Sequence, residues 1–249
     1  MQAEAQQKQH YNRIAAQYEI NYGDPDGVRY RETFLYPPMF AGLDLQGRNV
    51  LDALCGSGHA CDYLLTQKQA LVTGIDLSEE AIAKFKERWP HCQAVCSSIA
   101  SSGLADRSFD AVVVIMGLHH LHPHLREALH EIHRILRKGG TLCFAEPHQD
   151  SLFSRLRTLW YRHDHFFADN EEPIDLRALK EEFRDGFDFK TEKYVGGIAY
   201  LLILNSMIFR VPLWLKRVYS PVVMRLETLF GSFHTRAFSL AVICQWQKK

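Results

Sequence analysis

Short apolar runs bounded by turn residues recur along the first 150 residues of the chain. They lie at 48–54 (RNVLDAL), 70–76 (ALVTGID), 92–96 (CQAVC), 109–116 (FDAVVVIM) and 140–147 (GTLCFAEP). Each run has the length of a strand and is continuously apolar, which is typical of strands buried on both faces. Segments with helical spacing separate these runs, at 58–67, 78–89 and 123–137. The alternation predicts an α/β fold with a doubly wound, mostly parallel sheet.

The second half of the chain has a different pattern. A helix is expected around 175–183, and two further strand candidates follow at 186–195 and 236–247. The last of these ends the chain and is expected to close the sheet. Between the two strands, 196–233 is mostly apolar and too long for a hairpin turn. We therefore expect a helical insertion between the last two strands, within a single domain of 249 residues.

Composition excludes several classes of protein. Lys+Arg and Asp+Glu both number 29, so no overall charge directs the protein to nucleic acid or an acidic membrane. The polar N-terminus lacks the apolar core of a secretory signal. Six cysteines occur without the spacing of a disulfide module or a zinc site. We expect a cytoplasmic protein without a metal site.

A glycine loop follows the first predicted strand, in LDALCGSGHA at 51–60. Gly56 and Gly58 lie where ligands bind in open parallel sheets, but the third glycine of a dinucleotide fingerprint and the Lys-Ser/Thr of a P-loop are missing. Asp52 at the strand end would repel phosphate and attract an ammonium or sulfonium group. Asp76, which ends the second strand, is placed to accept hydrogen bonds from both hydroxyls of a ribose. A ribose with a cationic amino-acid tail describes S-adenosylmethionine.

Four motifs resemble those of the seven-strand, Rossmann-like S-adenosylmethionine-dependent methyltransferases, in particular their small-molecule branch. They are VLDALCGSGH, GIDLSEEAI, SFDAVVVIMGLHHL and LRKGGTLCFAEP, and the resemblance covers roughly residues 8–150. It implies that the last strand is antiparallel and the cofactor is S-adenosylmethionine. It also implies an N-terminal helical lid at 1–40, a cofactor-binding core at 41–150 and an acceptor-side half at 151–249, which contains the insert 196–233.

The resemblance also implies a set of cofactor-binding residues. They are Tyr11, Tyr18, Asp52, Ala53, Gly56, Gly58, Asp76, Leu77, Ser98, Ile99 and Met116. Tyr11 and Tyr18 would lie on a helix over the cofactor, or else pack a surface helix. Leu54 replaces the first glycine of the family loop, and we expect it to keep a negative φ. The backbone would then approach the ligand closely only at Gly56 and Gly58. Ser98 stands where many relatives carry an adenine-binding aspartate.

Histidines follow the fourth predicted strand, in GLHHLHPHL. By the resemblance they lie beside the transferred methyl group, and we expect His120, or else His119, to act as general base toward the acceptor. The alternative is that these side chains pack or cap the next helix. Glu146 and His148 at the end of the fifth strand, and the His163-Asp164-His165 segment, are further candidates.

The insert leaves three alternatives open: a wall of the acceptor pocket, a dimer face, or an interfacial helix that binds a lipid-linked substrate. A membrane-spanning helix is not expected, because Asn205, Arg210 and Pro212 interrupt the apolar run. The expected function is methylation of an apolar or amphipathic small molecule, with oxygen favoured as acceptor. A non-methylating protein of the same fold, or a lipid-linked or sugar acceptor, is the alternative. The expected partners are the small-molecule acceptor and no nucleic acid, in a monomer or homodimer.

Overall fold

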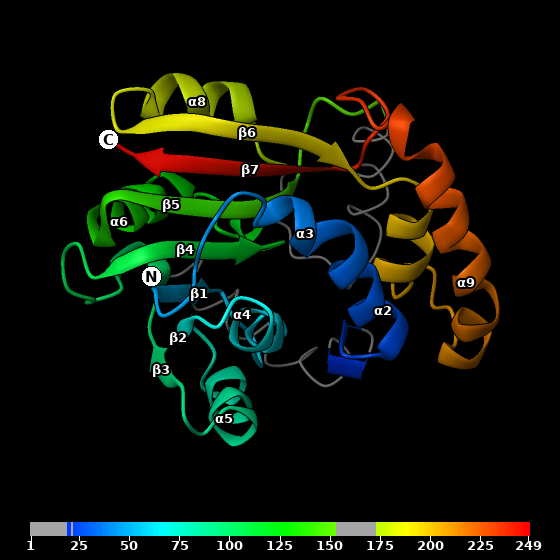
Figure 1. Ribbon diagram of the computed structural model, residues 1–249, viewed down its shortest axis with the longest axis horizontal. Coiled ribbons are helices and arrows are strands. Elements are labelled where there is room, and N and C mark those ends of the chain that lie inside the picture. The colour runs from blue at the N-terminus through cyan, green and yellow to red at the C-terminus, as the bar shows by residue number, and fades with distance from the viewer. Residues whose placement is uncertain (1–18, 21, 153–172) are drawn as a thin grey trace.

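A seven-stranded sheet forms the centre of the computed structural model, which describes residues 19–20, 22–152 and 173–249. The strands are β1 (Asn49–Ala53), β2 (Leu71–Asp76), β3 (Gln93–Cys96), β4 (Phe109–Ile115), β5 (Leu136–Pro147), β6 (Phe187–Val195) and β7 (Ala241–Lys248). Their order across the sheet is β3-β2-β1-β4-β5-β7-β6 (Figure 1). Strands β1 to β5 pair in parallel, whereas β7 runs antiparallel to both β5 and β6.

This sheet confirms the expected fold class, including the antiparallel last strand. One detail of the expectation was wrong. The last strand does not close the sheet, because β7 enters between β5 and β6 and leaves β6 at the edge. Residues 236–240, which the apolar pattern included in this strand, precede it.

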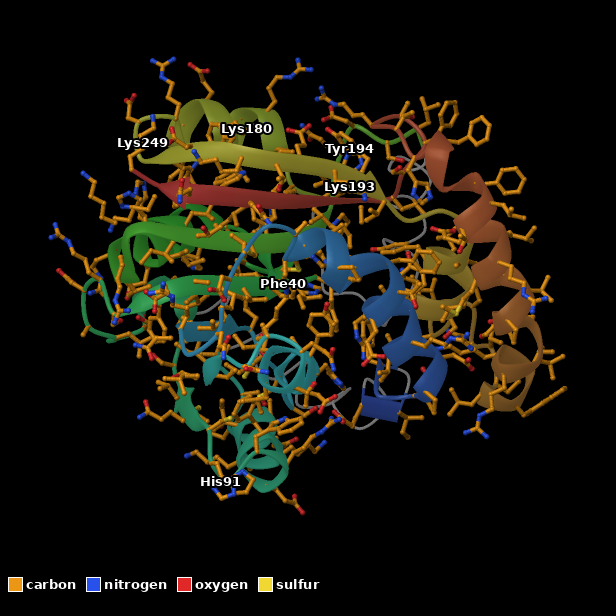
Figure 2. All side chains as sticks on the ribbon, viewed as in Figure 1. Phe40, His91, Lys180, Lys193, Tyr194 and Lys249 are labelled. Atoms are coloured by element: carbon orange, nitrogen blue, oxygen red, sulfur yellow. The ribbon has the colours of Figure 1, made fainter. Side chains whose placement is uncertain are left out.

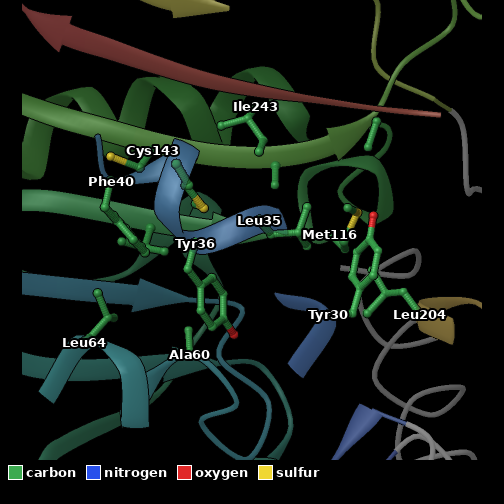
Figure 3. Packing of buried hydrophobic residues seen from close by; sticks show 14 of the residues in the cluster. Tyr30, Leu35, Tyr36, Phe40, Ala60, Leu64, Met116, Cys143, Leu204 and Ile243 are labelled. Atoms are coloured by element: carbon green, nitrogen blue, oxygen red, sulfur yellow. The ribbon is translucent and has the colours of Figure 1, made fainter. Parts of the chain in front are cut away.

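Helices cover both faces of the sheet. They are α2 (Pro25–Tyr30), α3 (Tyr36–Met39), α4 (Cys61–Thr66), α5 (Glu79–Arg88), α6 (Leu125–Ile135), α8 (Leu176–Phe183) and α9 (Leu213–Phe230). Alternate residues of the strands contribute to two apolar clusters, as the twofold repeat of a strand requires. One cluster joins α2, α3, α4 and α5 to the sheet. Figure 3 shows the part of this cluster around Tyr30, Tyr36 and Leu64. The other joins α6 and α8 to the opposite face.

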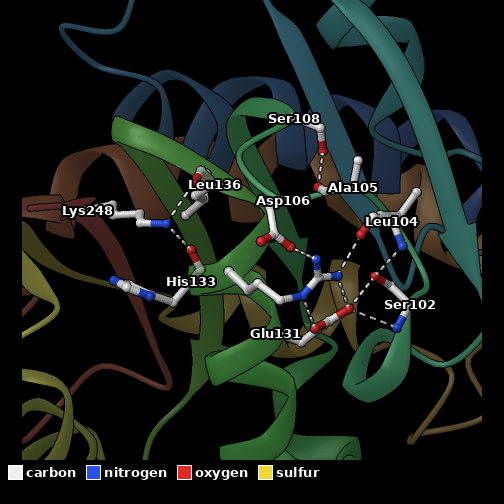
Figure 4. A network of polar contacts seen from close by, with 10 residues as sticks. Ser102, Leu104, Ala105, Asp106, Ser108, Glu131, His133, Leu136 and Lys248 are labelled. Atoms are coloured by element: carbon white, nitrogen blue, oxygen red, sulfur yellow. Dashed lines mark hydrogen bonds and ion pairs between the residues drawn. The ribbon is translucent and has the colours of Figure 1, made fainter.

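Polar contacts fix the loop that follows β3 to helix α6 (Figure 4). Glu131 on α6 accepts hydrogen bonds from the backbone N–H and the hydroxyl of Ser102. Arg134, one turn further along, donates to both Glu131 oxygens and pairs with Asp106. The hydrogen bond from Arg134 lowers the pKa of Glu131 to about 2, so this carboxylate stays charged. These contacts attach the segment around Ser102 and Asp106 to α6.

The insert between β6 and β7 is helical, as expected. It contains a π-helical turn at Tyr200–Leu204 and helix α9. It is not a separate unit, because Tyr200, Leu204 and Met224 belong to the apolar cluster that covers the sheet. None of the helices in the described ranges is long and apolar enough to cross a membrane.

Long-range contacts attach the N-terminal helices to the end of the chain. Lys216 Nζ on α9 lies 2.6 Å from Asp24 Oδ2, and both side chains are buried. Asp24 also caps α2, because it accepts the backbone N–H groups of Asp26 and Gly27. The side-chain amide of Gln245 on β7 donates to the carbonyl oxygens of Met39 and Ala41, each at 3.0 Å. Contacts from about 200 residues away therefore position both helices, since Lys216 holds the start of α2 and Gln245 holds the end of α3.

Candidate active site

A pocket lies beyond the carboxyl ends of β1, β2 and β4, the place that an open parallel sheet offers to a ligand. The expected site residues that line it are Asp52, Gly56, Asp76, Leu77, Ser98, Ile99, Met116 and His120. Ala53, Gly58 and His119 are not among the described residues that line it. Tyr11, Tyr18 and the 163–165 segment lie outside the described residues.

Asp52 is a buried carboxylate on the pocket wall. Asp52 is the last residue but one of β1. Its Oδ2 has no hydrogen-bond partner among the described residues. Burial, and then the nearby charge of Asp76, raise the pKa of Asp52 well above its usual value. A cation in the pocket would relieve both effects, because it would compensate the lost hydration and the repulsion between the carboxylates.

Asp76 organises the glycine loop from the neighbouring strand. Its Oδ2 accepts the N–H of Gly56 and its Oδ1 accepts the N–H of Ser78, each at 2.9 Å. Burial raises the pKa of Asp76, although these N–H groups oppose the shift. A carboxylate has about four lone-pair sites, so Asp76 retains acceptors for ligand hydroxyls.

The two loop glycines have different roles. Gly56 has φ +55°, and a Cβ there would meet no atom within 4 Å. The missing side chain therefore leaves room in the pocket. Gly58 has φ +83°, and a Cβ there would lie 2.5 Å from the Trp89 ring nitrogen. The expectation that Gly58 gives a ligand close approach is therefore wrong. The loop needs this glycine so that it can pack on α5 and Trp89.

Leu54 contradicts the expected negative φ, because its φ is +56°. The left-handed region costs an L residue about 1–2 kcal/mol, so the leucine must gain elsewhere. Its side chain packs on Gly117 after β4, where an added Cβ would lie 2.9 Å from Leu54 Cδ1. The backbone of this loop thus keeps the shape that a glycine would give it, while the leucine fills space that Gly117 leaves free.

The adenine side of the expected site is formed by the turn after β3. Ser98 and Ile99 both line the pocket. Ser98 Oγ accepts the N–H of Ala100 at 3.2 Å, so this hydroxyl caps the short helix at Ile99–Ser101. Leu77 lines the pocket from the end of β2. The serine therefore has a structural role in this turn beside any contact with a ligand.

Glu146 positions the histidines that follow β4. This fully buried carboxylate accepts the backbone N–H groups of Gly117, Leu118 and His119, and Oε2 lies 2.7 Å from His119 Nδ1. Burial raises the pKa of Glu146 to about 7, against the effect of these N–H donors. His119 is consequently held inside the protein. The His120 ring packs on it with 3.7 Å between ring centroids, and His120 reaches the pocket.

His148, which follows β5, is not among the described residues that line the pocket. His148 Nε2 lies 3.1 Å from the carbonyl oxygen of Ser239, so it joins the end of β5 to the segment before β7. His124 lines the pocket together with His120, and its Nδ1 lies 3.9 Å from Glu127 Oε1. The cluster thus supplies two imidazoles to the pocket. No group of His, Cys, Asp and Glu in the described ranges could hold a metal ion.

The N-terminal helices contribute residues that the sequence did not single out. Arg31 is 2% exposed and lines the pocket, yet its Nε and Nη1 have no hydrogen-bond partner among the described residues. Its Nη2 donates to the carbonyl oxygen of Tyr22 at 2.7 Å. A buried arginine with free N–H groups favours an anionic ligand group. In the sequence Arg31 is one cation in a helical segment, which by itself does not indicate a binding site. Its burial depends on contacts with distant parts of the chain.

Glu19 closes the pocket over the glycine loop. It accepts a 2.6 Å hydrogen bond from the Ser57 hydroxyl, and its Oε2 lies 3.4 Å from His59 Nε2. The His59 contact is the main cause that lowers the pKa of Glu19 to about 2. Leu204 of the insert lines the pocket, and the Tyr200 hydroxyl lies 3.5 Å from Met116 Sδ. The N-terminal segment and the insert therefore both reach the site.

Comparison with known proteins agrees with this geometry. Residues 50–140 match a family described as a methyltransferase domain. Over 115 residues, the chain is 36% identical to the phthiotriol/phenolphthiotriol dimycocerosates methyltransferase of Mycobacterium tuberculosis. That match covers 45% of this chain and 42% of the relative, so the chain spans less than half of the relative's length.

Solved structures resemble almost the whole chain. A S-adenosylmethionine-dependent methyltransferase of Thermotoga maritima, named as a possible histamine N-methyltransferase, has a TM-score of 0.67 at 16% identity and covers 98% of this chain and 100% of its own. The [4+2]-cyclase SpnF has a TM-score of 0.59 at 17% identity, with 89% of this chain and 81% of its own covered. At such identities the likeness shows the fold. The chain shares the seven-strand, Rossmann-like fold of solved S-adenosylmethionine-dependent methyltransferases, and its residues 50–140 match the methyltransferase-domain family.

Proposed function

We propose that the protein transfers a methyl group from S-adenosylmethionine to an apolar or amphipathic small molecule. The main support is that one pocket contains two buried side chains of opposite charge type, Asp52 and Arg31. Asp52 Oδ2 and Arg31 Nε and Nη1 have no hydrogen-bond partners among the described residues. An α-amino acid carries the matching ammonium and carboxylate groups. When bound, the cofactor supplies a methyl group on a sulfonium, which is electrophilic.

Each part of the pocket fits one part of this cofactor. Asp52 would accept the ammonium group and Arg31 would donate to the carboxylate. Asp76 would accept the ribose hydroxyls with its remaining lone pairs, and the bare Gly56 leaves space beside it. Ser98 and Ile99 would hold the adenine. The role of 1–40 as a lid is part of this proposal, and Glu19 and Arg31 support it because both line the pocket.

The acceptor side is proposed for the wall formed by Leu121 and Leu204, which are apolar and line the pocket. The relative from Mycobacterium tuberculosis, named for phthiotriol and phenolphthiotriol dimycocerosates, supports an apolar or lipid-linked acceptor. Leu204 brings the insert 196–233 into this wall. The variant Leu204→Ser should raise the acceptor KM several-fold and leave the cofactor affinity unchanged.

For the acceptor atom we propose oxygen. A hydroxyl must lose its proton as the O–CH3 bond forms, and His120 is placed in the pocket to accept that proton. His119 acts differently, because it is buried against Glu146 and supports the His120 ring. General base catalysis contributes typically 10²–10⁴-fold, so His120→Ala should lower kcat at least about 100-fold at neutral pH.

The matched variants separate catalysis from packing. His124→Ala removes the other imidazole that lines the pocket and should leave kcat within a few-fold. His120→Gln should lose activity like His120→Ala while its cofactor affinity stays at the parental value. Equal and small losses in all three variants would show that positioning, without a base, drives the reaction.

The cofactor assignment is tested by calorimetry. S-adenosylmethionine should bind and NAD should not, and Arg31→Met should weaken S-adenosylmethionine about tenfold or more, as expected for a hydrogen bond to a charged group. Decarboxylated S-adenosylmethionine, which lacks the group that Arg31 would bind, should bind Arg31→Met and the parental protein alike. Preference for NAD, or an unchanged affinity in Arg31→Met, would contradict the assignment.

A second candidate is a protein that binds the cofactor but does not methylate. The departures at Leu54 and Ser98 from the family pattern favour it, and the fold is shared with a cyclase. Mass spectrometry after an acceptor screen decides between the two, since methylation adds one methyl group to the product. We further propose that the protein is a monomer or homodimer. The six free cysteines support a location in the reducing cytoplasm.

A further inference from the structure

Helix α9 and the segment that follows it carry exposed apolar side chains, which we call the α9 surface. Its members are Trp214, Val218, Val222, Leu229, Phe230, Phe233 and Phe238. The first four lie on one stripe of the helix, because they are spaced by four, four and seven residues. They are between 58% and 71% exposed. The 18 residues of α9 make the helix about 27 Å long, and the stripe from Trp214 to Leu229 covers about 22 Å of it.

The charges of α9 that face solvent are all positive. Arg217 and Arg225 are exposed, and Arg225 lies within the apolar stripe. The one acidic residue of the helix, Glu227, is buried, where it accepts the N–H groups of Gly197 and Ala199. The other cation, Lys216, is buried in its pair with Asp24. Large apolar side chains interspersed with arginines are typical of helices that lie in a membrane interface.

Charge decides between the possible occupants of this surface. In a twofold dimer the same patch meets itself, so Arg217 and Arg225 would face the arginines of the second copy. An anionic bilayer instead attracts both side chains, which can extend to the phosphates while their stems stay on the apolar surface. We propose that the α9 surface docks on an anionic membrane, with α9 parallel to the plane of the headgroups.

The position of α9 gives this docking a consequence for the pocket. The helix runs along the flank of the molecule (Figure 1), and the side chains on its outer side project away from the rest of the protein (Figure 2). On its inner side, the Tyr219 hydroxyl donates to the carbonyl oxygen of Leu202 in the π-helical turn whose Leu204 lines the pocket. If the proposed function holds, an apolar acceptor would pass from the bilayer to the pocket along this turn. Membrane docking itself does not depend on methyl transfer.

The test is vesicle flotation with the full chain. One set of vesicles is phosphatidylcholine alone, and the other contains phosphatidylglycerol as well. The protein should float with the anionic vesicles, and added salt should release it, because salt screens the arginines. Val218→Glu and Val222→Glu should each weaken the partition at least tenfold, and Arg225→Gln about fivefold.

The matched control is Leu71→Glu, which places the same charge on another exposed apolar residue, 59% exposed at the start of β2 and away from α9. It should float like the parental protein. All four positions are exposed, so the folded state of each variant is checked by circular dichroism. The proposal is overturned if the parental protein floats with neither vesicle, or if Leu71→Glu loses binding equally. It is also overturned if Val218→Glu converts a dimer to a monomer in light scattering, since the surface would then belong to a second copy.

Discussion

The left-handed backbone of Leu54 leads to a prediction whose sign is unusual. Two variants, Leu54→Ala and Leu54→Gly, both remove the side chain that packs on Gly117, so the loss of that packing is largely common to both. At an ordinary position glycine is less stable than alanine by about 0.5–1 kcal/mol. At φ +56° alanine keeps the steric cost of about 1–2 kcal/mol that glycine avoids.

The net expectation is that Leu54→Gly is more stable than Leu54→Ala by about 1 kcal/mol. Urea unfolding followed by circular dichroism measures the difference, and the slopes should agree between the two variants. Leu54→Asn offers a third point, because asparagine tolerates this backbone region better than alanine. If Leu54→Ala is the more stable of the two by half a kilocalorie or more, the residue does not keep a positive φ in solution and the account of the loop is wrong.

Three further predictions concern charged groups. Asp76→Ala should weaken S-adenosylmethionine at least tenfold in calorimetry, because two hydrogen bonds to a carboxylate are lost; an unchanged affinity would place the ribose elsewhere. Lys216→Met should lower the free energy of unfolding by about 3–5 kcal/mol, because Asp24 is left buried and charged, and adding Asp24→Asn should restore most of it; no recovery would mean that the pair is not coupled. The pKa of Glu19 falls from 4.5 to about 2, chiefly through the His59 contact, so its stabilisation is complete above pH 4.5 and is lost toward about pH 2. The stability advantage of the parental protein over Glu19→Gln should therefore shrink across that window in acid unfolding, and a constant difference would contradict the contact.

The sequence was informative about the centre of the sheet because the information there is local. Continuous apolar runs identify β1 to β5 one by one, and the acids Asp52 and Asp76 follow at the strand ends where ligands bind. Both reach the pocket. Glu146 was also visible, as an acid that ends a buried strand, but its role in fixing the next loop depends on three N–H groups that only the folded backbone assembles.

Other features could not be read locally. The φ of Leu54 depends on the space beside Gly117, 63 positions later in the chain, so no rule for a residue in its own loop predicts it. Arg31 becomes a buried pocket residue only because α2 is tied to α9 through Asp24 and Lys216. The place of β7 within the sheet is a matter of pairing between distant strands, and apolar periodicity carries no information about partners.

The insertion of β7 between β5 and β6 constrains the order in which the protein can be made. During synthesis β6 leaves the ribosome before its sheet neighbour exists, since its pairing in the described sheet is with β7. The same last strand supplies Gln245, which holds the carbonyl groups of Met39 and Ala41. The nascent chain must therefore keep β6 without its described neighbour, and Met39 and Ala41 without their Gln245 contacts, until β7 emerges. Nascent chains arrested before β7 should therefore bind chaperones and aggregate more than nascent chains arrested after β7 has emerged.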